Sequence, residues 1–417
     1  MATTSGHTDS PASDTARPRF ALPALCATQV IGWGVLYYAF PVMLPSITRD
    51  TGWSAPAATA SFSAALVVSA LAGIAVGHII DRTGPRRVMA IGSVLGALAM
   101  TLVATAPTLL AFAVGWLLAG PAMAATFYQP AFAAITRWYG SRRVRALTTL
   151  TLAGGLASTI FAPITAALTE HLGWRHAALT LAVIVLLTAT PLHALALRGP
   201  WPTHASDQSG DSVAARPGPA RLPGPRPDPR SVIRSRPFLT LAFALTLSGF
   251  AMYAVVFGLI PLLTHRGATT AQAAWALGLG GLGQTLGRLV YAPLAARSAP
   301  RTRTAALIAA GGLTTALLAA VPGPLWLLTL VAMLAGTVRG NLTLLQATAV
   351  TDRWGIRAYG RLTATLAAPV TVAGALAPWA GAALMGPSGG YTQLFWVLAT
   401  LSGLAAVAAS LDRPARA

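Results

Sequence analysis

Long apolar segments alternate with short polar ones along the whole chain. Most of the apolar segments reach the ~20 residues that a helix needs to cross the hydrocarbon core of a membrane. Backbone groups inside lipid must form their hydrogen bonds within the same segment, so helices are expected. The pattern predicts twelve such helices, at residues 20–47, 56–80, 88–106, 108–136, 146–169, 174–197, 237–263, 271–296, 303–321, 324–351, 360–385 and 391–411.

A polar stretch at 198–236 separates the first six predicted helices from the last six. It is rich in Pro, Arg, Ser and Asp, so it buries too little apolar surface to fold and is expected to be a flexible linker. The predicted parts of the chain are a polar arm at 1–19, a six-helix bundle at 20–197, the linker at 198–236, a second bundle at 237–411 and a tail at 412–417.

The two predicted bundles repeat one another in sequence. Leu118-Ala119-Gly120 recurs 216 residues later as Leu334-Ala335-Gly336. Further matching pairs are Arg137-Trp138 with Arg353-Trp354, Tyr37 with Tyr253, and, 215 residues apart, Pro163 with Pro378 and Pro85 with Pro300. Two bundles built from one duplicated unit predict a central cavity at their interface, which is where transporters with parallel repeats bind substrate.

Charge indicates which side of the membrane each loop faces. Only 9% of the residues are charged, the net charge is +19, and every basic residue other than His is Arg. A basic excess suggests nucleic-acid binding, but most of these Arg lie in loops on one side of the predicted membrane, as the positive-inside rule expects. We therefore expect a bacterial inner-membrane protein with both termini in the cytoplasm and no nucleic-acid partner.

The loop between the second and third predicted helices is unusually charged for this chain. It resembles the signature Gly-x-x-x-Asp-Arg-x-Gly-Arg-Arg of the major facilitator superfamily. The matching residues are Gly77, Asp81, Arg82, Gly84, Arg86 and Arg87. Together with twelve segments in two halves, the resemblance implies that family's fold, an all-α membrane protein with two pseudo-symmetric six-helix bundles.

The resemblance also implies a gating role for these six residues, because in that family the loop links the cytoplasmic ends of the two bundles. A carboxylate can pair with Arg across the gap between the bundles, and the pair breaks when the halves rock. The alternative is a loop that only anchors the topology. The corresponding loop near Arg297 keeps its Arg but lacks the Asp, so a one-sided gate is expected.

Three further segments resemble the monocarboxylate and oxalate–formate branch of the same family. They are Gly32-Trp33-Gly34 with Tyr37-Tyr38-Ala39-Phe40, Arg137-Trp138-Tyr139 with Arg142-Arg143, and Gln284 to Arg288. In that branch an Arg in the eighth span pairs with the substrate carboxylate, which implies this role for Arg288, with Gln284 one turn earlier. The Lys that members of the branch carry in span one or span eleven has no counterpart, because this chain contains no Lys.

Two arginines are predicted in the middle of the membrane, Arg288 and Arg339, and no acidic residue is. A charge at that depth costs at least about 2.5–3.5 kcal/mol to insert. Each must therefore be met by water, by amide or carbonyl oxygens, or by an anionic substrate, whose carboxylate the planar guanidinium fits. The alternatives are an Arg288 that bonds only helix carbonyls, and an Arg339 in a structural network with Asn341 and Gln346.

Aromatic and amide residues complete the predicted substrate site. They are Tyr37, Tyr253, Tyr128, Gln129 and Asn341. A Tyr in a membrane span more often serves packing or interfacial anchoring, which is the alternative for all three tyrosines. His78 and His193 are expected near the interface, and no carboxylate is predicted in the substrate path. Either the substrate carries the proton with it, or the protein exchanges anions or works as a uniporter.

These patterns predict a secondary transporter that moves a small organic anion, similar to a monocarboxylate, by alternating access. The coupled species, a proton or a counter-anion, stays open, as does uniport. The alternative is an exporter of drugs or of other hydrophobic or neutral molecules; the missing Gly-Pro-rich motif in span five counts against it. An enzyme or a membrane sensor is disfavoured, because no nucleophile–base pair, phosphate loop or output domain is evident. We expect no cofactor, no metal and a monomer.

Overall fold

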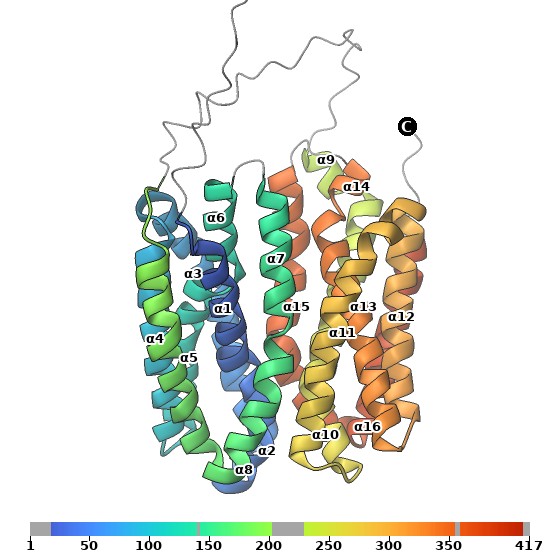
Figure 1. Ribbon diagram of the computed structural model, residues 1–417. Helices are drawn as coiled ribbons and strands as arrows, with labels where there is room; N and C mark the ends of the chain where they lie inside the picture. Colours follow the sequence, from blue (N-terminus) through green and yellow to red (C-terminus); the bar gives the residue numbers. More distant parts are fainter. Residues whose placement is uncertain (1–17, 140–141, 202–228, 355–358, 412–417) are drawn as a thin grey trace, which may run out of the picture.

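The computed structural model describes residues 18–139, 142–201, 229–354 and 359–411. In this part of the chain the structure is helical, and the helices stand side by side in two groups (Figure 1). The first group contains α1 (Ala21–Trp33), η1 (Gly34–Tyr38), α2 (Ala39–Thr51), α3 (Ala55–Thr83), α4 (Pro85–Thr105), α5 (Leu109–Thr126), α6 (Tyr128–Tyr139), α7 (Arg143–Gly155), α8 (Ala157–Ile184), η3 (Val185–Ala189) and η4 (Leu192–Ala196).

The second group follows the predicted linker, whose described end holds the short helix α9 (Pro229–Ile233). Its other helices are α10 (Arg236–His265), α11 (Thr270–Arg297), α12 (Pro300–Ala320), α13 (Leu325–Thr348), α14 (Thr351–Trp354), α15 (Tyr359–Ser388) and α16 (Tyr391–Leu411). Nearly all of the predicted arm, most of the linker and the predicted tail lie outside the described residues.

Helices cover every predicted apolar segment, and several begin one turn earlier than the hydropathy pattern suggested. α4 begins at Pro85 and α12 at Pro300, each three residues before the predicted start. A Pro in the first turn is already shaped for a helix and gives up no hydrogen bond there. Ser54 caps the N-terminus of α3 and Ser235 that of α10, because each hydroxyl accepts a hydrogen bond from an N–H group of the first turn. Polar first turns therefore extend the helices beyond their apolar parts.

Ten helical stretches in the described part of the chain are long and apolar enough to cross a membrane. One of them, Arg143–Ala196, has 54 residues and contains Gly173 at φ 75°, where the helix breaks. A positive φ of this kind suits Gly because it has no Cβ. α11 is not among the ten, so the count of twelve spans stays a prediction.

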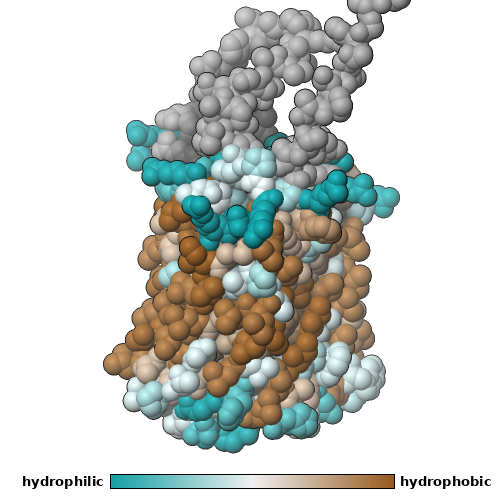
Figure 2. Space-filling model, turned by 60° about the vertical axis from the view of Figure 1, so that its left-hand side comes forward, coloured by the Kyte–Doolittle hydropathy of each residue, from teal (hydrophilic) through white to brown (hydrophobic). Residues whose placement is uncertain are grey.

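The surface of the molecule agrees with a membrane environment. Figure 2 shows a belt of hydrophobic side chains between two hydrophilic ends. Large apolar side chains are exposed on several helices, for example Leu187, Phe243 and Leu313. In water such a belt would drive association, whereas hydrocarbon is a suitable solvent for it.

The two ends of the molecule differ in how the groups of helices pack. The Arg-rich end carries the connections at Gly84, at Arg142 and at Ser298; the Arg-poor end carries those at Gly52, Gly173 and Gly267. Near the Arg-poor end one core cluster contains residues of both groups, including Phe40, Phe62 and Trp116 with Phe257 and Phe395. That end is therefore closed by packing.

At the Arg-rich end each group has a core of its own. Phe238, Tyr291 and Leu345 belong to a cluster formed by the second group alone, and Met89 and Ile135 to one formed by the first group alone. The described side chains thus form no shared core at this end. Among the described residues, the interface between the groups therefore has a shared core at the Arg-poor end and separate cores at the Arg-rich end.

Candidate functional site

A cavity of about 370 Å³ lies between the two groups of helices. Four of the predicted site residues line it: Tyr37 and Tyr128 with Gln129 from the first group, and Tyr253 from the second. Gln346, which was named only in the structural alternative for Arg339, also lines the cavity. The structure therefore brings residues of both halves to one place.

The π-helical turn η1 positions Tyr37 at this cavity. An α-helix would carry one residue fewer in such a turn, and π-turns of this kind occur often at functional sites. Tyr37 is 4% exposed, and its hydroxyl is buried without a hydrogen-bond partner in the described part of the chain. Its ring contacts Tyr38 edge-on and also Phe257 of the second group, with centroids 5.1 and 5.4 Å away.

Aromatic rings form much of the first-group wall. Trp33 stacks on Phe127 with ring centroids 4.1 Å apart, and its ring lies 5.3 Å from that of Tyr128. Opposite them, the Tyr253 ring lies against α15, where a Cβ at Gly374 would be 2.9 Å from the ring. Trp33 and Phe127 were not predicted as site residues, although Trp33 belongs to one of the segments that carry the family resemblance.

Arg339 lies behind the cavity wall, at the contact between α11 and α13. Its Nε donates to Oε1 of Gln284 at 2.9 Å, and its Nη2 is buried without a partner among the described residues. Arg339 is close enough to Tyr37 and Tyr253 to interact with both electrostatically. Gln284 and Arg339 were each predicted as site residues but not as a pair; the structure bonds them to one another, and neither is among the residues that line the cavity.

Arg288 reaches from the second group to the first. Its Nη1 donates to the backbone carbonyl of Thr151, in the last turn of α7. A Cβ at Gly155 would lie 3.1 Å from the same Nη1, so the glycine permits this close approach. Tyr128 is also within electrostatic range of Arg288. In this conformation Arg288 thus makes the carbonyl contact that was the alternative to substrate pairing.

No acid balances the two arginines within the described residues. Ion pairs there involve Asp50, Asp81 and Asp352, which lie near helix ends, and none includes Arg288 or Arg339. Hydrogen bonds to neutral oxygens satisfy these guanidiniums only in part. The middle of the interface is therefore an electropositive region beside the cavity.

Asn341 lies apart from the cavity. It is 5% exposed, its Nδ2 donates to the Thr337 carbonyl at 3.0 Å, and its Oδ1 has no partner among the described residues. Asn341 is not among the residues that line the cavity. The sequence showed that Asn341 and Arg339 share a span but not that Asn341 bonds its own helix while Arg339 bonds Gln284 of α11.

The charged loop at Gly77–Arg87 makes its contacts within the first group. Asp81 accepts a hydrogen bond from Arg137 at 2.9 Å, and Arg86 Nε donates to the Ala194 carbonyl at 2.7 Å. Arg137 also lies over the Trp201 ring, 4.7 Å from its centroid. Among the contacts of the described residues, none from Asp81 or Arg86 reaches the second group. The expected link between the two bundles is therefore not made in this conformation.

The remaining residues of the signature surround this contact. Gly84 has φ 79° and ends α3, which a residue with a Cβ would do less easily. Arg82 and Arg87 are exposed, and a Cβ at Gly77 would meet open space. The structure therefore shows a packing or conformational reason for Gly84 but none for Gly77.

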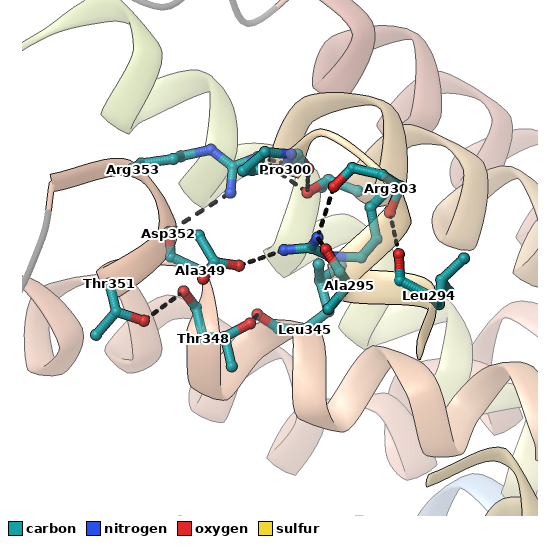
Figure 3. A network of polar contacts seen from close by, with 12 residues as sticks. Leu294, Ala295, Pro300, Arg303, Leu345, Thr348, Ala349, Thr351, Asp352 and Arg353 are labelled. Atoms are coloured by element: carbon teal, nitrogen blue, oxygen red, sulfur yellow. Dashed lines mark hydrogen bonds and ion pairs between the residues drawn. The ribbon is translucent and has the colours of Figure 1, made fainter. Parts of the chain in front are cut away.

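The second group has an ion pair of its own, which lies within that group and so does not test the expected one-sided gate between the bundles. Figure 3 shows Arg303 of α12 bonded to Asp352 of α14. Arg303 also donates to the Ala295 and Ser298 carbonyls, and Arg353 Nη2 donates to Thr304 Oγ1 at 2.9 Å. The acid is supplied from the end of the tenth predicted span instead of from the loop, so comparison of the loops alone missed it.

His193 is buried rather than interfacial, which corrects the expectation for this residue. It is 1% exposed, and its Nδ1 lies 2.8 Å from the hydroxyl of Ser93 on α4. The π-helical turn η4 directs the ring into the first group. His78, by contrast, is exposed near the end of α3.

Comparison with known proteins identifies the family. The sequence model of the Major Facilitator Superfamily matches residues 25–324 and 241–417, so the chain belongs to this superfamily and is a multi-pass membrane protein. Among its relatives it resembles the monocarboxylate branch. It is 29% identical over 273 residues to monocarboxylate transporter 13 of Bos taurus, covering 62% of this chain and 60% of that protein.

A second relative is monocarboxylate transporter 11 of Homo sapiens, 32% identical over 262 residues, which are 62% of this chain and 51% of the human protein. The matches thus span about half to three-fifths of these relatives. Among solved structures, a bacterial homologue of the human lysosomal transporter Spinster, inward-facing and occupied, superposes with a TM-score of 0.73. That likeness has 15% sequence identity over 94% of this chain and 96% of the other, and it concerns the fold.

Proposed function

We propose that this protein is a secondary transporter that carries a small organic anion of the monocarboxylate kind, with Arg288 as its principal counter-ion. One observation carries the proposal: two guanidiniums lie beside the cavity between the halves, and no described acid pairs with either. An anionic substrate would supply the missing negative charge. The resemblance to monocarboxylate transporters supports the choice of a carboxylate.

Arg288 would exchange one oxygen for another when substrate binds. It now bonds the neutral carbonyl of Thr151, and a carboxylate accepts a stronger, charge-assisted bond with two oxygens. Because Thr151 belongs to the first group and Arg288 to the second, this exchange would alter a contact between the two halves. Substrate binding and rocking of the halves would then be linked through one side chain.

The open side of the cavity would face the cytoplasm. The Arg-rich end is cytoplasmic under the positive-inside rule, which places both termini there and makes this an inward-facing conformation of a protein in the bacterial inner membrane. We further propose twelve spans in bundles at 20–197 and 237–411, counting α11 as a span and the helix broken at Gly173 as two. A monomer would suffice, with substrate accompanied by a proton or exchanged for another anion.

Uptake into proteoliposomes tests this function. Radiolabelled monocarboxylates, dicarboxylates and neutral solutes are compared for the unaltered protein, Arg288→Ala and Arg288→Lys, with the exposed Arg49→Ala as control. We expect uptake of monocarboxylates, a loss of at least about 100-fold in kcat/KM for Arg288→Ala, typical of a truncated buried charge contact, partial activity for Arg288→Lys, and no change for Arg49→Ala.

Transport of neutral solutes with normal rates in Arg288→Ala would overturn the proposal. It would favour the exporter of hydrophobic or neutral molecules, to which the apolar part of the cavity wall is also suited. Unaltered monocarboxylate uptake by Arg288→Ala would leave a monocarboxylate transporter but remove Arg288 from its site.

A further inference from the structure

We infer that the substrate is a monocarboxylate with an aromatic ring and without an amino group, such as an arylacetate, rather than an acid of two or three carbons. This inference rests on the proposed function and adds the substrate class. It depends on the size of the cavity, the aromatic wall, the buried donors without partners, and the absence of acids from the described wall.

The cavity is larger than a two- or three-carbon acid requires. Its volume of about 370 Å³ lies within the ~300–1,000 Å³ of pockets that hold drug-sized ligands. A small acid would leave most of this volume to water beside apolar groups such as Leu66, Met123 and Val370, which line the cavity. A substrate with a large apolar part would displace that water and gain from the hydrophobic effect.

The wall offers flat aromatic surfaces on both sides. Trp33, Phe127 and Tyr128 form a continuous set of rings on the first group, with centroids of Trp33 at 4.1 and 5.3 Å from the other two. Tyr253 faces the same cavity from the second group. Aromatic rings prefer offset-stacked or edge-to-face contacts, which a planar substrate ring can make with both walls.

Three residues that line the cavity carry a buried polar atom without a hydrogen-bond partner among the described residues, and each of these atoms can donate: the Tyr37 hydroxyl, the Thr363 hydroxyl and Trp33 Nε1. Arg339 Nη2 is a further buried donor without a partner there. Tyr37 and Trp33 line the cavity, and Arg339 lies behind it within electrostatic range of Tyr37. An ionised carboxylate only accepts hydrogen bonds, so it is complementary to such a set of groups. Its ring would then extend along the aromatic wall.

An amino group would find no counterpart in this cavity. No Asp or Glu is among the residues that line the described cavity, and Arg288 and Arg339 make its surroundings electropositive. An ammonium group placed there would lose water without gaining an ion pair, which is costly. Aromatic amino acids and aromatic amines should therefore bind more weakly than the aromatic acid of the same size.

The test compares ligands that differ in one feature. Thermal stabilisation and competition for uptake are measured with phenylacetate, acetate, lactate, phenylalanine, 2-phenylethylamine and benzyl alcohol on the unaltered protein, which requires no variant to fold. We expect phenylacetate to stabilise most and to have a KM at least about tenfold below that of lactate, since a single methylene in an apolar pocket already changes specificity by about tenfold or more.

A matched pair of variants locates the aromatic contact. Trp33→Leu should raise the KM for phenylacetate several-fold more than the KM for lactate, whereas Trp326→Leu, a Trp that is 68% exposed on α13, should change neither. The differential effect separates a ring contact from a general loss of structure.

The outcomes distinguish this inference from the proposed function. If lactate or acetate is carried as well as phenylacetate and the carriage depends on Arg288, the transport function stands and the aromatic class is wrong. Equal binding of phenylalanine or 2-phenylethylamine would also overturn the inference. If benzyl alcohol is carried and no acid is, both proposals fail.

Discussion

At the scale of single residues, the ion pairs of the two halves differ in burial, and therefore in how much they contribute to the stability of the protein. Arg303 has a side chain only 3% exposed and pairs with Asp352, which is 26% exposed. Asp81 in the first group is 52% exposed and pairs with Arg137. Exposed ion pairs contribute little to stability, while breaking a buried one leaves a charge without compensation. The ion pair of the second half should therefore contribute more to the free energy of unfolding than that of the first half.

Replacing the acid in each pair should reveal this difference. Asp352→Asn should lower the free energy of unfolding by about 3 kcal/mol, because Arg303 stays buried without its partner. Asp81→Asn should cost less than about 1 kcal/mol. Thermal unfolding in detergent, followed by tryptophan fluorescence, measures both. Similar unfolding midpoints for the two variants would contradict an unequal contribution of the two ion pairs to stability.

Arginines at the Arg-poor end have a structural explanation that charge counting did not supply. Arg266 donates to the Leu318, Ala319 and Val321 carbonyls at the end of α12, with distances of 2.6, 2.8 and 2.6 Å. Arg175 does the same for the Ala104 and Ala106 carbonyls at the end of α4. Cations suit helix C-termini, where carbonyls lack partners. These two residues therefore oppose the positive-inside trend for a local reason.

At the scale of elements, close contact between α11 and α13 brings Gln284 and Arg339 together. Glycines face one another along this contact, and a Cβ at Gly336 would overlap the carbonyl of Gly280. Small residues allow helix backbones to approach closely in membranes, where dispersion contacts and hydrogen bonds replace the hydrophobic effect. Arg288 and Arg339 are therefore carried by one tightly packed pair of helices.

Gly336→Ala should separate these helices. The backbone at Gly280 cannot yield as a flexible side chain would, so we expect a loss of about 3 kcal/mol of stability or more. Arg339 should also lose its bond to Gln284, with weaker substrate binding as a result. Gly403→Ala is the control, because a Cβ there meets nothing within 4 Å. Midpoints of unfolding that fall equally in both variants would argue against the tight contact.

At the scale of the whole molecule, the distribution of cores defines a conformation. The halves share a core near the Arg-poor end and have separate cores near the Arg-rich end. Two further contacts join the halves on the closed side: the Trp379 amide donates to Ser63 Oγ at 3.1 Å, and Thr159 Oγ1 donates to the Gly278 carbonyl at 2.8 Å. Rocking to the opposite state would have to break these contacts and expose Phe257 and its neighbours.

Chemical labelling tests this asymmetry. In a Cys26→Ala background, a membrane-impermeant maleimide should modify Gln129→Cys from the side of the Arg-rich end, because this residue lines the open cavity. Ser63→Cys should stay protected, since Ser63 is 2% exposed. Inside-out vesicles and spheroplasts provide the two sides. Modification of Gln129→Cys only from the periplasmic side would contradict the proposed orientation or conformation.

The candidate site was predictable in part. Tyr37, Tyr128, Gln129 and Tyr253 were singled out from the sequence and line one cavity. Asn341 does not line the cavity, and Gln346, which does, was named only in the structural alternative for Arg339. One helix presents different faces to different neighbours, and the sequence does not say which face meets the other half. Trp33 entered the sequence-based prediction only through the family resemblance. Its stacking on Phe127 could not be predicted, because the two residues are far apart along the chain.

Sequence alone determined the helices, the duplicated halves, the superfamily and the Arg-rich side, because hydropathy, repeats and loop charge are local properties of the chain. Only the tertiary structure decided that Arg288 bonds Thr151, 137 residues away, that Asp352 completes the second ion pair, and that the shared core of the two halves lies near the Arg-poor end. Such contacts depend on how closely helices approach, and this distance is set by small residues and side-chain packing at each interface.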